Sequence, residues 1–150
     1  MKKISVLVFI FLAGVLYSQG QPPKYCTWKA SVATSNVKLT NGAKAKITNT
    51  LQVDADNEGT CVWEKNEVYM KISVTTMPKG VNKSDAEDIF KAGQKFYLNN
   101  GHVTKGGTGR FIAKIGAVEI EGMYVVEVAI YNKAGKEIGS SSTIRFRYSD

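Results

Sequence analysis

Apolar side chains recur at every second position along most of the chain, which is the period of a half-buried β-strand. The clearest case is residues 67–76, where an apolar face alternates with a polar face that carries Tyr69 and Lys71. The inward-facing residues of this segment are Val68, Met70, Ile72 and Val74. One face of the predicted strand is therefore buried and the other is exposed to water.

The same alternation predicts further strands along the rest of the chain. Residues 109–116 place Phe111, Ala113 and Ile115 inward, and residues 142–148 place Ile144, Phe146 and Tyr148 inward with Arg145 and Arg147 outward. Strand 109–116 is expected to continue through Val118 and Ile120 after a bend at Gly116. Weaker patterns occur at 27–33, 35–39, 45–55 and 94–100. Seven or eight strands are predicted in total.

A single short helix is predicted, near residues 85–92. Ser84 and Glu87 match the S-x-x-E capping box, and Gly93 is placed to end the helix in a left-handed conformation. The predicted fold class is therefore all-β: one antiparallel β-sandwich of about seven or eight strands with one short helix. A small β-barrel is the alternative.

The C-terminal segment 122–148 resembles the last two strands of bacterial immunoglobulin-like and PKD-like β-sandwich domains. The residues that carry the resemblance are Gly122, Tyr124, Val126, Val128, Ile130, Asn132 and Gly135. The resemblance implies an immunoglobulin-like sandwich, with alternate apolar residues facing the opposite sheet and Gly135 supplying a positive φ in the hairpin loop. The inter-sheet cysteine of antibody domains is absent from this segment. Domains of this kind share a fold and differ in task, so the resemblance implies no particular function.

The first 20 residues have the composition of a cleavable signal peptide. Lys2 and Lys3 precede an almost wholly apolar run at 4–17, which is too short to span a bilayer comfortably, and Ser18 and Gly20 are suitable for cleavage after Gly20. We therefore expect a signal peptide at 1–20 and a single domain at 21–150. The expected location is secreted or periplasmic, with no membrane span.

The chain is basic. It has 20 Lys and Arg residues against 13 Asp and Glu, a net charge of +7. Loss of Lys2 and Lys3 with the signal peptide leaves 18 basic and 13 acidic residues, or +5. An exported basic protein meets anionic glycans, lipids or proteins sooner than nucleic acid, so we expect an anionic partner and no nucleic acid.

Cys26 and Cys61 are the only cysteines, and both are followed two residues later by tryptophan, at Trp28 and Trp63. In an oxidising compartment the pair is expected to form one structural disulfide, because the C-x-x-C spacing of redox-active sites is absent. If the segments are strands, each cysteine shares a face with its tryptophan. The chain-entropy relation gives a stabilisation of about 3.8 kcal/mol for the closed loop.

The glycine-rich loop at 99–110 holds the only histidine, His102, together with Lys105 and Arg110. It does not match a Walker phosphate loop, and a strand pattern follows it where a helix is needed. We expect His102 to be a solvated turn residue, since no acid or free nucleophile is identifiable beside it, and a single histidine cannot build a usual zinc site. The glycines indicate a long flexible connection. Lys105, Arg110 and His102 are its candidate binding residues for an anionic partner.

A second loop is predicted at 54–60. Asp54, Asp56 and Glu58, with Gly59, partly match the first half of a calcium-binding loop, but Lys65 stands where the closing carboxylate is required. An acidic turn is the alternative interpretation. No cofactor and no resident metal are expected.

Three function classes remain for the mature domain. The first is a non-catalytic recognition domain, expected to be monomeric, that binds a glycan or protein of the cell envelope or exterior. The second is a periplasmic inhibitor or immunity protein that blocks a toxin or hydrolase, and the third is an accessory subunit of an envelope assembly. We expect no enzymatic activity.

Overall fold

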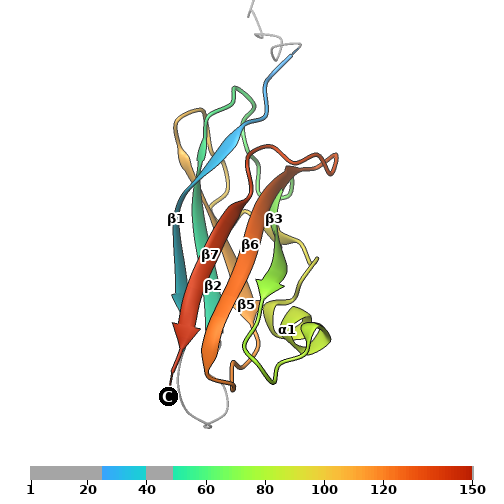
Figure 1. The fold of residues 1–150 in the computed structure, drawn as a ribbon. Helices are drawn as coiled ribbons and strands as arrows, with labels where there is room; N and C mark the ends of the chain where they lie inside the picture. Colours follow the sequence, from blue (N-terminus) through green and yellow to red (C-terminus); the bar gives the residue numbers. More distant parts are fainter. Residues whose placement is uncertain (1–24, 40–48, 150) are drawn as a thin grey trace, which may run out of the picture.

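The computed structural model describes residues 25–39 and 49–149, and this part of the chain forms two β-sheets and one short helix (Figure 1). The predicted signal peptide and the first residues of the 45–55 segment lie outside the described residues. The elements are β1 Ala30–Lys38, β2 Asn49–Asn57, β3 Val68–Thr76, α1 Lys83–Phe90, β4 Phe96–Tyr97, β5 Thr108–Ile115, β6 Gly122–Asn132 and β7 Ser142–Tyr148.

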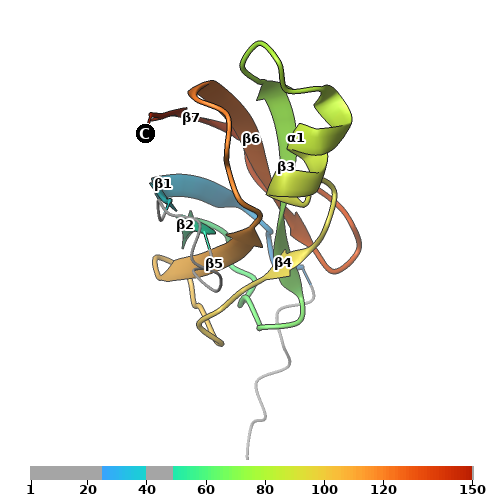
Figure 2. The same cartoon turned by 90° about the horizontal axis from the view of Figure 1, so that it is seen from below.

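The strands form two antiparallel sheets that face each other, as the end-on view shows (Figure 2). One sheet has three strands in the order β1-β2-β5, and the other has four in the order β4-β3-β6-β7. The two sheets do not join into a closed barrel. The prediction of an all-β sandwich is therefore confirmed, and the barrel alternative is wrong.

The core lies between the sheets and is built from the inward half of each alternating pattern. Leu51, Val53 and Ala55 of β2 are fully buried, while the residues between them are half-buried. Burying one such aliphatic side chain is worth about 1.5–3 kcal/mol relative to leaving it exposed. A one-residue slip of β2 would turn this apolar set outward, so the pattern itself fixes the register.

The two long sides of the sandwich are closed differently. On the β4/β5 side Leu98 forms a bridge with Phe111, and α1 inserts Phe90 toward Tyr124 and Phe146 at ring-centroid distances of 5.9 and 5.7 Å. On the β1/β7 side an isolated bridge joins Ala30 to Gly139 at one end. Strands β1 and β7 themselves are the edge strands of two different sheets (Figure 1). The β4/β5 side is thus covered by a helix, and the β1/β7 side consists of one edge strand from each sheet.

The helix is present, but its predicted cap is wrong. Asn82 is the N-cap, and its side-chain oxygen accepts a hydrogen bond of 2.8 Å from the backbone N–H of Asp85. Ser84 lies inside the first turn. At the other end the left-handed residue is Lys91, with φ 53°, and Gly93 follows with φ 75°. Both Asn82 and Ser84 are good capping residues, and the chain uses the earlier one, so the helix begins sooner than expected.

The expected continuation of strand 109–116 is also wrong. Strand β5 ends at Ile115, because the backbone N–H of Gly116 donates to the carbonyl of Ile89 at 2.7 Å and ties the chain to the end of α1. Val118 is still buried, as predicted, but Ile120 is 41% exposed. The chain therefore leaves the three-stranded sheet here and crosses to β6.

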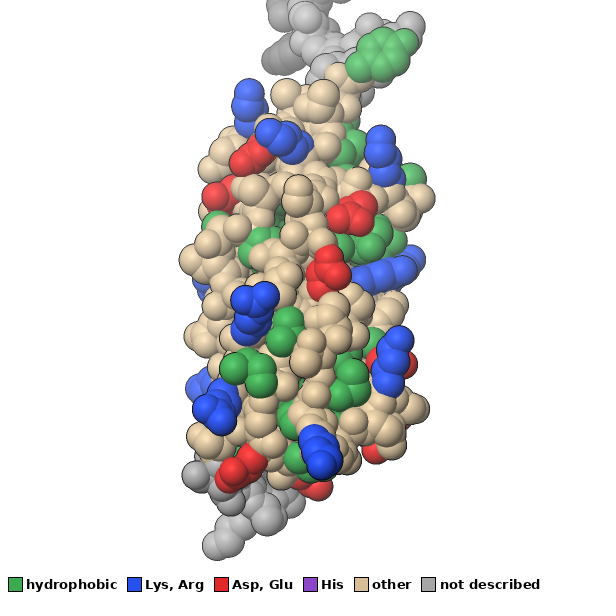
Figure 3. Space-filling model, viewed as in Figure 1, with side chains coloured by type: hydrophobic (Ala, Val, Ile, Leu, Met, Phe, Trp, Pro, Cys, Tyr) green, Lys and Arg blue, Asp and Glu red, His purple; other side chains and the backbone are tan. Residues whose placement is uncertain are grey.

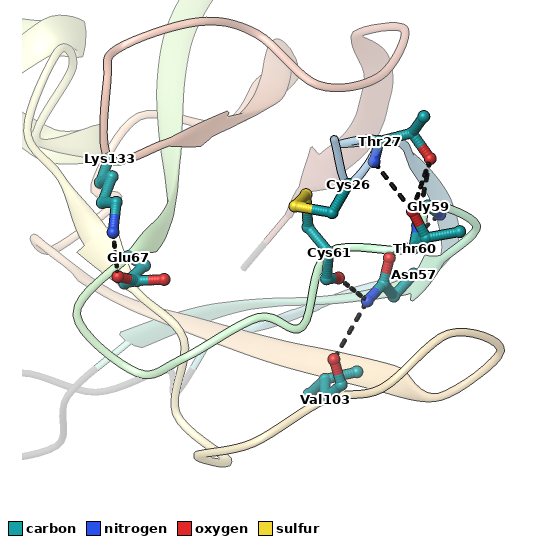
Figure 4. Close-up of a disulfide and its surroundings, with 9 residues drawn as sticks. All are labelled: Cys26, Thr27, Asn57, Gly59, Thr60, Cys61, Glu67, Val103 and Lys133. Atoms are coloured by element: carbon teal, nitrogen blue, oxygen red, sulfur yellow. Dashed lines mark hydrogen bonds and ion pairs between the residues drawn. A yellow bond between two sulfur atoms is a disulfide. The ribbon is translucent and has the colours of Figure 1, made fainter. Parts of the chain in front are cut away.

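Cys26 and Cys61 form the predicted disulfide, with a Cα–Cα distance of 4.8 Å (Figure 4). Neither cysteine lies in a strand, so the predicted strand setting is wrong. Asn57, at the end of β2, organises the turn: its amide nitrogen donates to the carbonyls of Cys61 (2.8 Å) and Val103 (3.0 Å). Gly59 fits because a Cβ there would lie 2.2 Å from the carbonyl oxygen of Thr27. The disulfide thus closes a segment that side-chain hydrogen bonds already shape.

Candidate functional site

The glycine-rich loop is a hydrogen-bonded structure, in contrast to the long flexible connection expected from its glycines. Asn100 caps it, accepting from the N–H of Arg110 (2.6 Å) and donating to the carbonyl of Thr108 (2.9 Å). Val103 is buried and exchanges two 2.9 Å backbone hydrogen bonds with Trp63. The loop is therefore anchored to the core at its middle.

Arg110 is not a free cation for a partner. Its Nε donates to Asp54 Oδ1 at 2.9 Å and its Nη2 to Asp54 Oδ2 at 3.0 Å, a two-point pairing across β5 and β2. The hydrogen bond from Arg110 lowers the pKa of Asp54 below its usual value, and the same pairing raises the pKa of Arg110. Because the two side chains satisfy each other's charge and hydrogen bonds, the prediction that Arg110 binds an anionic ligand is weakened.

His102 and Lys105 are exposed at the loop surface. The expectation that no acid stands beside His102 is wrong, because its Nδ1 lies 2.8 Å from Oε1 of Glu64. The two residues meet because the Trp63–Val103 backbone pair brings their loops together. Both cysteines are oxidised, so neither supplies a thiol nucleophile to this pair. The geometry gives an exposed hydrogen-bonded pair, and Lys105 is the unpaired cation of the loop.

The acidic residues do not form the predicted turn. Asp54 and Asp56 lie on β2, and Glu58 follows the strand end. Each has a different partner: Asp54 pairs with Arg110, Asp56 accepts from the Thr108 hydroxyl at 2.7 Å, and Glu58 pairs with Lys29 at 2.8 Å. Each carboxylate is thus engaged by its own partner, and within residues 25–39 and 49–149 no group of three or more His, Cys, Asp or Glu is placed to hold a metal ion.

A different surface gathers side chains suited to binding: the outer face of the four-stranded sheet. Tyr69 on β3 is directly opposite Tyr97 on β4 and Tyr131 on β6, so the three rings form a row across the sheet. Tyr69 stacks on Tyr131 at a centroid distance of 5.6 Å and meets the edge of Tyr97 at 5.7 Å. We call these three residues the tyrosine row.

Two lysines pack against the tyrosine row. Lys95 Nζ lies 4.7 Å from the ring centroid of Tyr69, and Lys71 Nζ lies 5.4 Å from that of Tyr131, both within cation–π range. Beneath this cover Tyr69 is only 3% exposed, although the alternation placed it on the wet face, while Tyr97 is 44% exposed. Burial is also the main cause that raises the pKa of Tyr131, and Glu137 adds to it. Tyr97 is therefore exposed, Tyr131 is half-buried, and both rings pack on the buried ring of Tyr69.

A groove of about 610 Å³ adjoins the tyrosine row. Its floor is the outer face of β3 and β6, including Lys71 and Tyr131, and α1 borders it with Lys83 and Glu87. Glu127 also lines it and accepts a hydrogen bond from the Ser141 hydroxyl. Carboxylates, ammonium groups, hydroxyls and an aromatic ring thus converge on one concave surface. Figure 3 shows that acidic and basic side chains are interspersed over the viewed face of the molecule, with no patch of a single sign.

Sequence reasoning did not identify this surface. Tyr69, Tyr97 and Tyr131 lie far apart along the chain, and only the pairing of β4, β3 and β6 brings them together. The available signal was weak: a tyrosine at an outward position in each of three predicted strands. Outward aromatic residues on neighbouring strands indicate a shared face, but the strand order must be known first.

Comparison with known proteins gives no family for this chain. No family model matches it, and no curated protein matches its sequence. Among solved structures it is similar to the archaellum periplasmic stator protein FlaG from Sulfolobus acidocaldarius, with 11% sequence identity and a TM-score of 0.45 over 79% of this chain and 99% of that chain. A likeness this distant carries no functional argument. In the described part of the chain, no helix is long and apolar enough to cross a bilayer.

Proposed function

We propose that this chain is an exported, non-catalytic recognition domain that binds a glycan of the cell envelope or exterior on the outer face of its four-stranded sheet. The observation that carries the proposal is the tyrosine row beside a groove with hydroxyl, carboxylate and ammonium groups. The disulfide supports export, since such bonds persist in oxidising compartments.

The chemistry of the face matches that of a sugar chain. Each pyranose ring has a C–H face that packs on an aromatic ring and hydroxyls that pair with carboxylates, ammonium groups and the phenol oxygen. Tyr97 offers an exposed ring and Tyr131 a half-buried one, and Lys71, Glu127 and Glu137 line the groove beside Tyr131. Because the groove carries charges of both signs, it suits a glycan of low net charge better than the anionic partner expected from composition.

The test is affinity electrophoresis of the mature domain through gels that contain neutral or acidic polysaccharides, followed by calorimetry on any glycan that retards it. Tyr97→Ala and Tyr131→Ala should each weaken binding by about tenfold or more, as expected of aromatic contact residues. Tyr25→Ala is the matched control, because Tyr25 is 86% exposed and lies outside both sheets. It should bind like the unmodified domain.

Two results would contradict the proposal. If Lys105→Ala abolished glycan binding while both tyrosine variants bound normally, the glycine-rich loop would be the site. If the bound glycan gained reducing ends on incubation with the domain, the protein would be an enzyme. Thermal melting of each variant separates lost binding from lost folding.

A further inference from the structure

The edge of β7 is open and has the features of a strand-docking site. In the described part of the chain β7 pairs with β6 alone, over an unbroken register from Ser142 to Tyr148. A free edge presents unpaired backbone N–H and C=O groups, and proteins usually blunt it with proline, charged side chains, a bulge or a very short strand. Strand β7 has seven residues with no proline and no register shift, and its only charged side chains are Arg145 and Arg147.

The other edges are protected. Strand β1 has a register shift between Val32 and Thr34, and β4 has only two residues. Strand β5 is bridged to the opposite sheet through Phe111 and Leu98. The contrast makes the open β7 edge a specific feature of this fold.

The core beside β7 is incompletely covered. Phe146 and Tyr148 on the inner side of β7, and Val32 and Val37 on β1, are half-buried residues packed against the core. Where β1 and β7 diverge, a groove of about 470 Å³ is lined by residues 29–32 and 139–142 together with Glu58. An added strand next to β7 would begin at this groove and cover these apolar side chains.

The exposed side chains of β7 determine which charge an added strand should carry. Arg145 and Arg147 are exposed, and neither forms an ion pair within residues 25–39 and 49–149. The carboxylate of Glu127, on neighbouring β6, lies opposite Thr143 and bonds to Ser141. Side chains directly opposite each other on paired strands lie about 4.5–5.5 Å apart at Cβ, so acidic residues on an added strand would reach both guanidinium groups.

A second copy of the chain does not meet this requirement. Antiparallel pairing of two β7 strands over their full length would set Arg145 directly opposite Arg145 of the second copy, and like charges directly opposite are destabilising. The unpaired arginines thus favour an acidic strand from another protein over self-association.

We propose that the β7 edge binds an extended segment of a partner protein in which acidic residues alternate with apolar residues, as a fifth strand of the β4-β3-β6-β7 sheet. Main-chain hydrogen bonds supply the common part of this interaction, and the alternate side chains supply specificity. The site is separate from the tyrosine row and does not depend on glycan binding.

The probe is a synthetic nine-residue peptide of alternating valine and glutamate, with lysine and serine versions for comparison, measured by fluorescence anisotropy on the mature domain. The glutamate peptide should bind most tightly. Arg145→Glu with Arg147→Glu should weaken it by about tenfold or more and transfer the preference to the lysine peptide. Lys105→Glu with Lys114→Glu, the same charge change at exposed residues elsewhere, should leave the preference unchanged.

Backbone pairing is tested with N-methylated versions of the glutamate peptide. Methylation of the alternate residues whose N–H groups face β7 should abolish binding, and methylation of the other set should not. Equal binding of the three peptides, equal effects of both methylated sets, or equal effects of the two charge-reversal pairs would overturn the proposal. So would a dimer in sedimentation analysis that the Arg145→Glu, Arg147→Glu variant loses, because the occupant would then be a second copy.

Discussion

Asn57 gives the sharpest test of how the disulfide region is held, because it is fully buried and its amide makes three hydrogen bonds (Figure 4). The nitrogen donates to the carbonyls of Cys61 and Val103, and the oxygen accepts from the N–H of Gly59 at 3.1 Å. Asn57→Ala removes all three at once. Substitution should therefore loosen the turn that holds Cys61.

The magnitude follows from what the truncation leaves behind. Val103 still accepts from the N–H of Trp63, and Gly59 still donates to the carbonyl of Lys29, so these groups keep one partner each. The buried carbonyl of Cys61 loses the Asn57 amide. The hydrogen bonds to Val103 and Gly59 are worth about 1 kcal/mol each, and the third, to Cys61, costs about 1–2 kcal/mol because its carbonyl is left unsatisfied. The free energy of unfolding should therefore fall by about 3–4 kcal/mol. For a domain of this size that lowers the melting temperature by roughly 10 °C or more.

The assay is urea unfolding of the oxidised mature domain, followed by tryptophan fluorescence, to which fully buried Trp63 and half-buried Trp28 both contribute. Asn36→Ala is the matched control, since Asn36 is exposed on β1, and it should change the free energy of unfolding by less than about 0.5 kcal/mol. Asn57→Asp keeps the acceptor but not the donors, so it should be destabilising at pH 7 and less so when acid protonates the new carboxyl. A loss below about 1 kcal/mol for Asn57→Ala would refute the reasoning.

Three further predictions follow from the same contacts. Cys26→Ser with Cys61→Ser should lower the free energy of unfolding by up to about 3.8 kcal/mol in urea titration, and a thiol assay on the native protein should find no reactive group. Asp54 has a folded pKa below its usual 3.8, so its contribution to stability is present above that value and is lost as the pH falls through the folded pKa; acid titration of Asp54→Asn should lack this component. Millimolar calcium should leave the melting temperature within 1 °C or so, because Asp54 is already paired with Arg110, and a rise of several degrees abolished by Asp54→Ala would contradict this.

The sandwich was predictable because each strand can be recognised from its own residues. Each strand carries its own period-two pattern, so residues such as Val68 and Phe111 identify the buried face without knowledge of the partner strand. The disulfide was predictable for a similar reason, since two cysteines allow one pairing. The resemblance of 122–148 to immunoglobulin-like and PKD-like domains stays a prediction: the β6–β7 pairing is present and Gly135 has φ 78°, but these features define a hairpin and no family.

The contacts of the candidate site were not predictable, because they join residues that are far apart in the sequence. Arg110 meets Asp54 only in the register of β2 with β5, at a sequence separation of 56 residues. His102 likewise meets Glu64 only because Trp63 pairs with Val103. From the sequence, Arg110 and His102 were equally plausible as free binding groups. The fold assigns both to internal pairs.

These internal pairs change the meaning of the basic composition. The predicted mature charge of +5 suggested an anionic partner anywhere on the surface, but four of the basic side chains in the described residues are already paired with carboxylates. The ion pairs of Lys and Arg in the described residues are Lys29–Glu58, Lys83–Glu87, Arg110–Asp54 and Lys133–Glu67, and His102 is hydrogen-bonded to Glu64. Arg145 and Arg147 form no ion pair within residues 25–39 and 49–149, and they lie on β7, the edge strand of the four-stranded sheet. Since a screened surface charge acts over about one Debye length, the local arrangement and not the net charge determines what this protein attracts, and Arg145 and Arg147 are the two cations that an added strand at the β7 edge would meet.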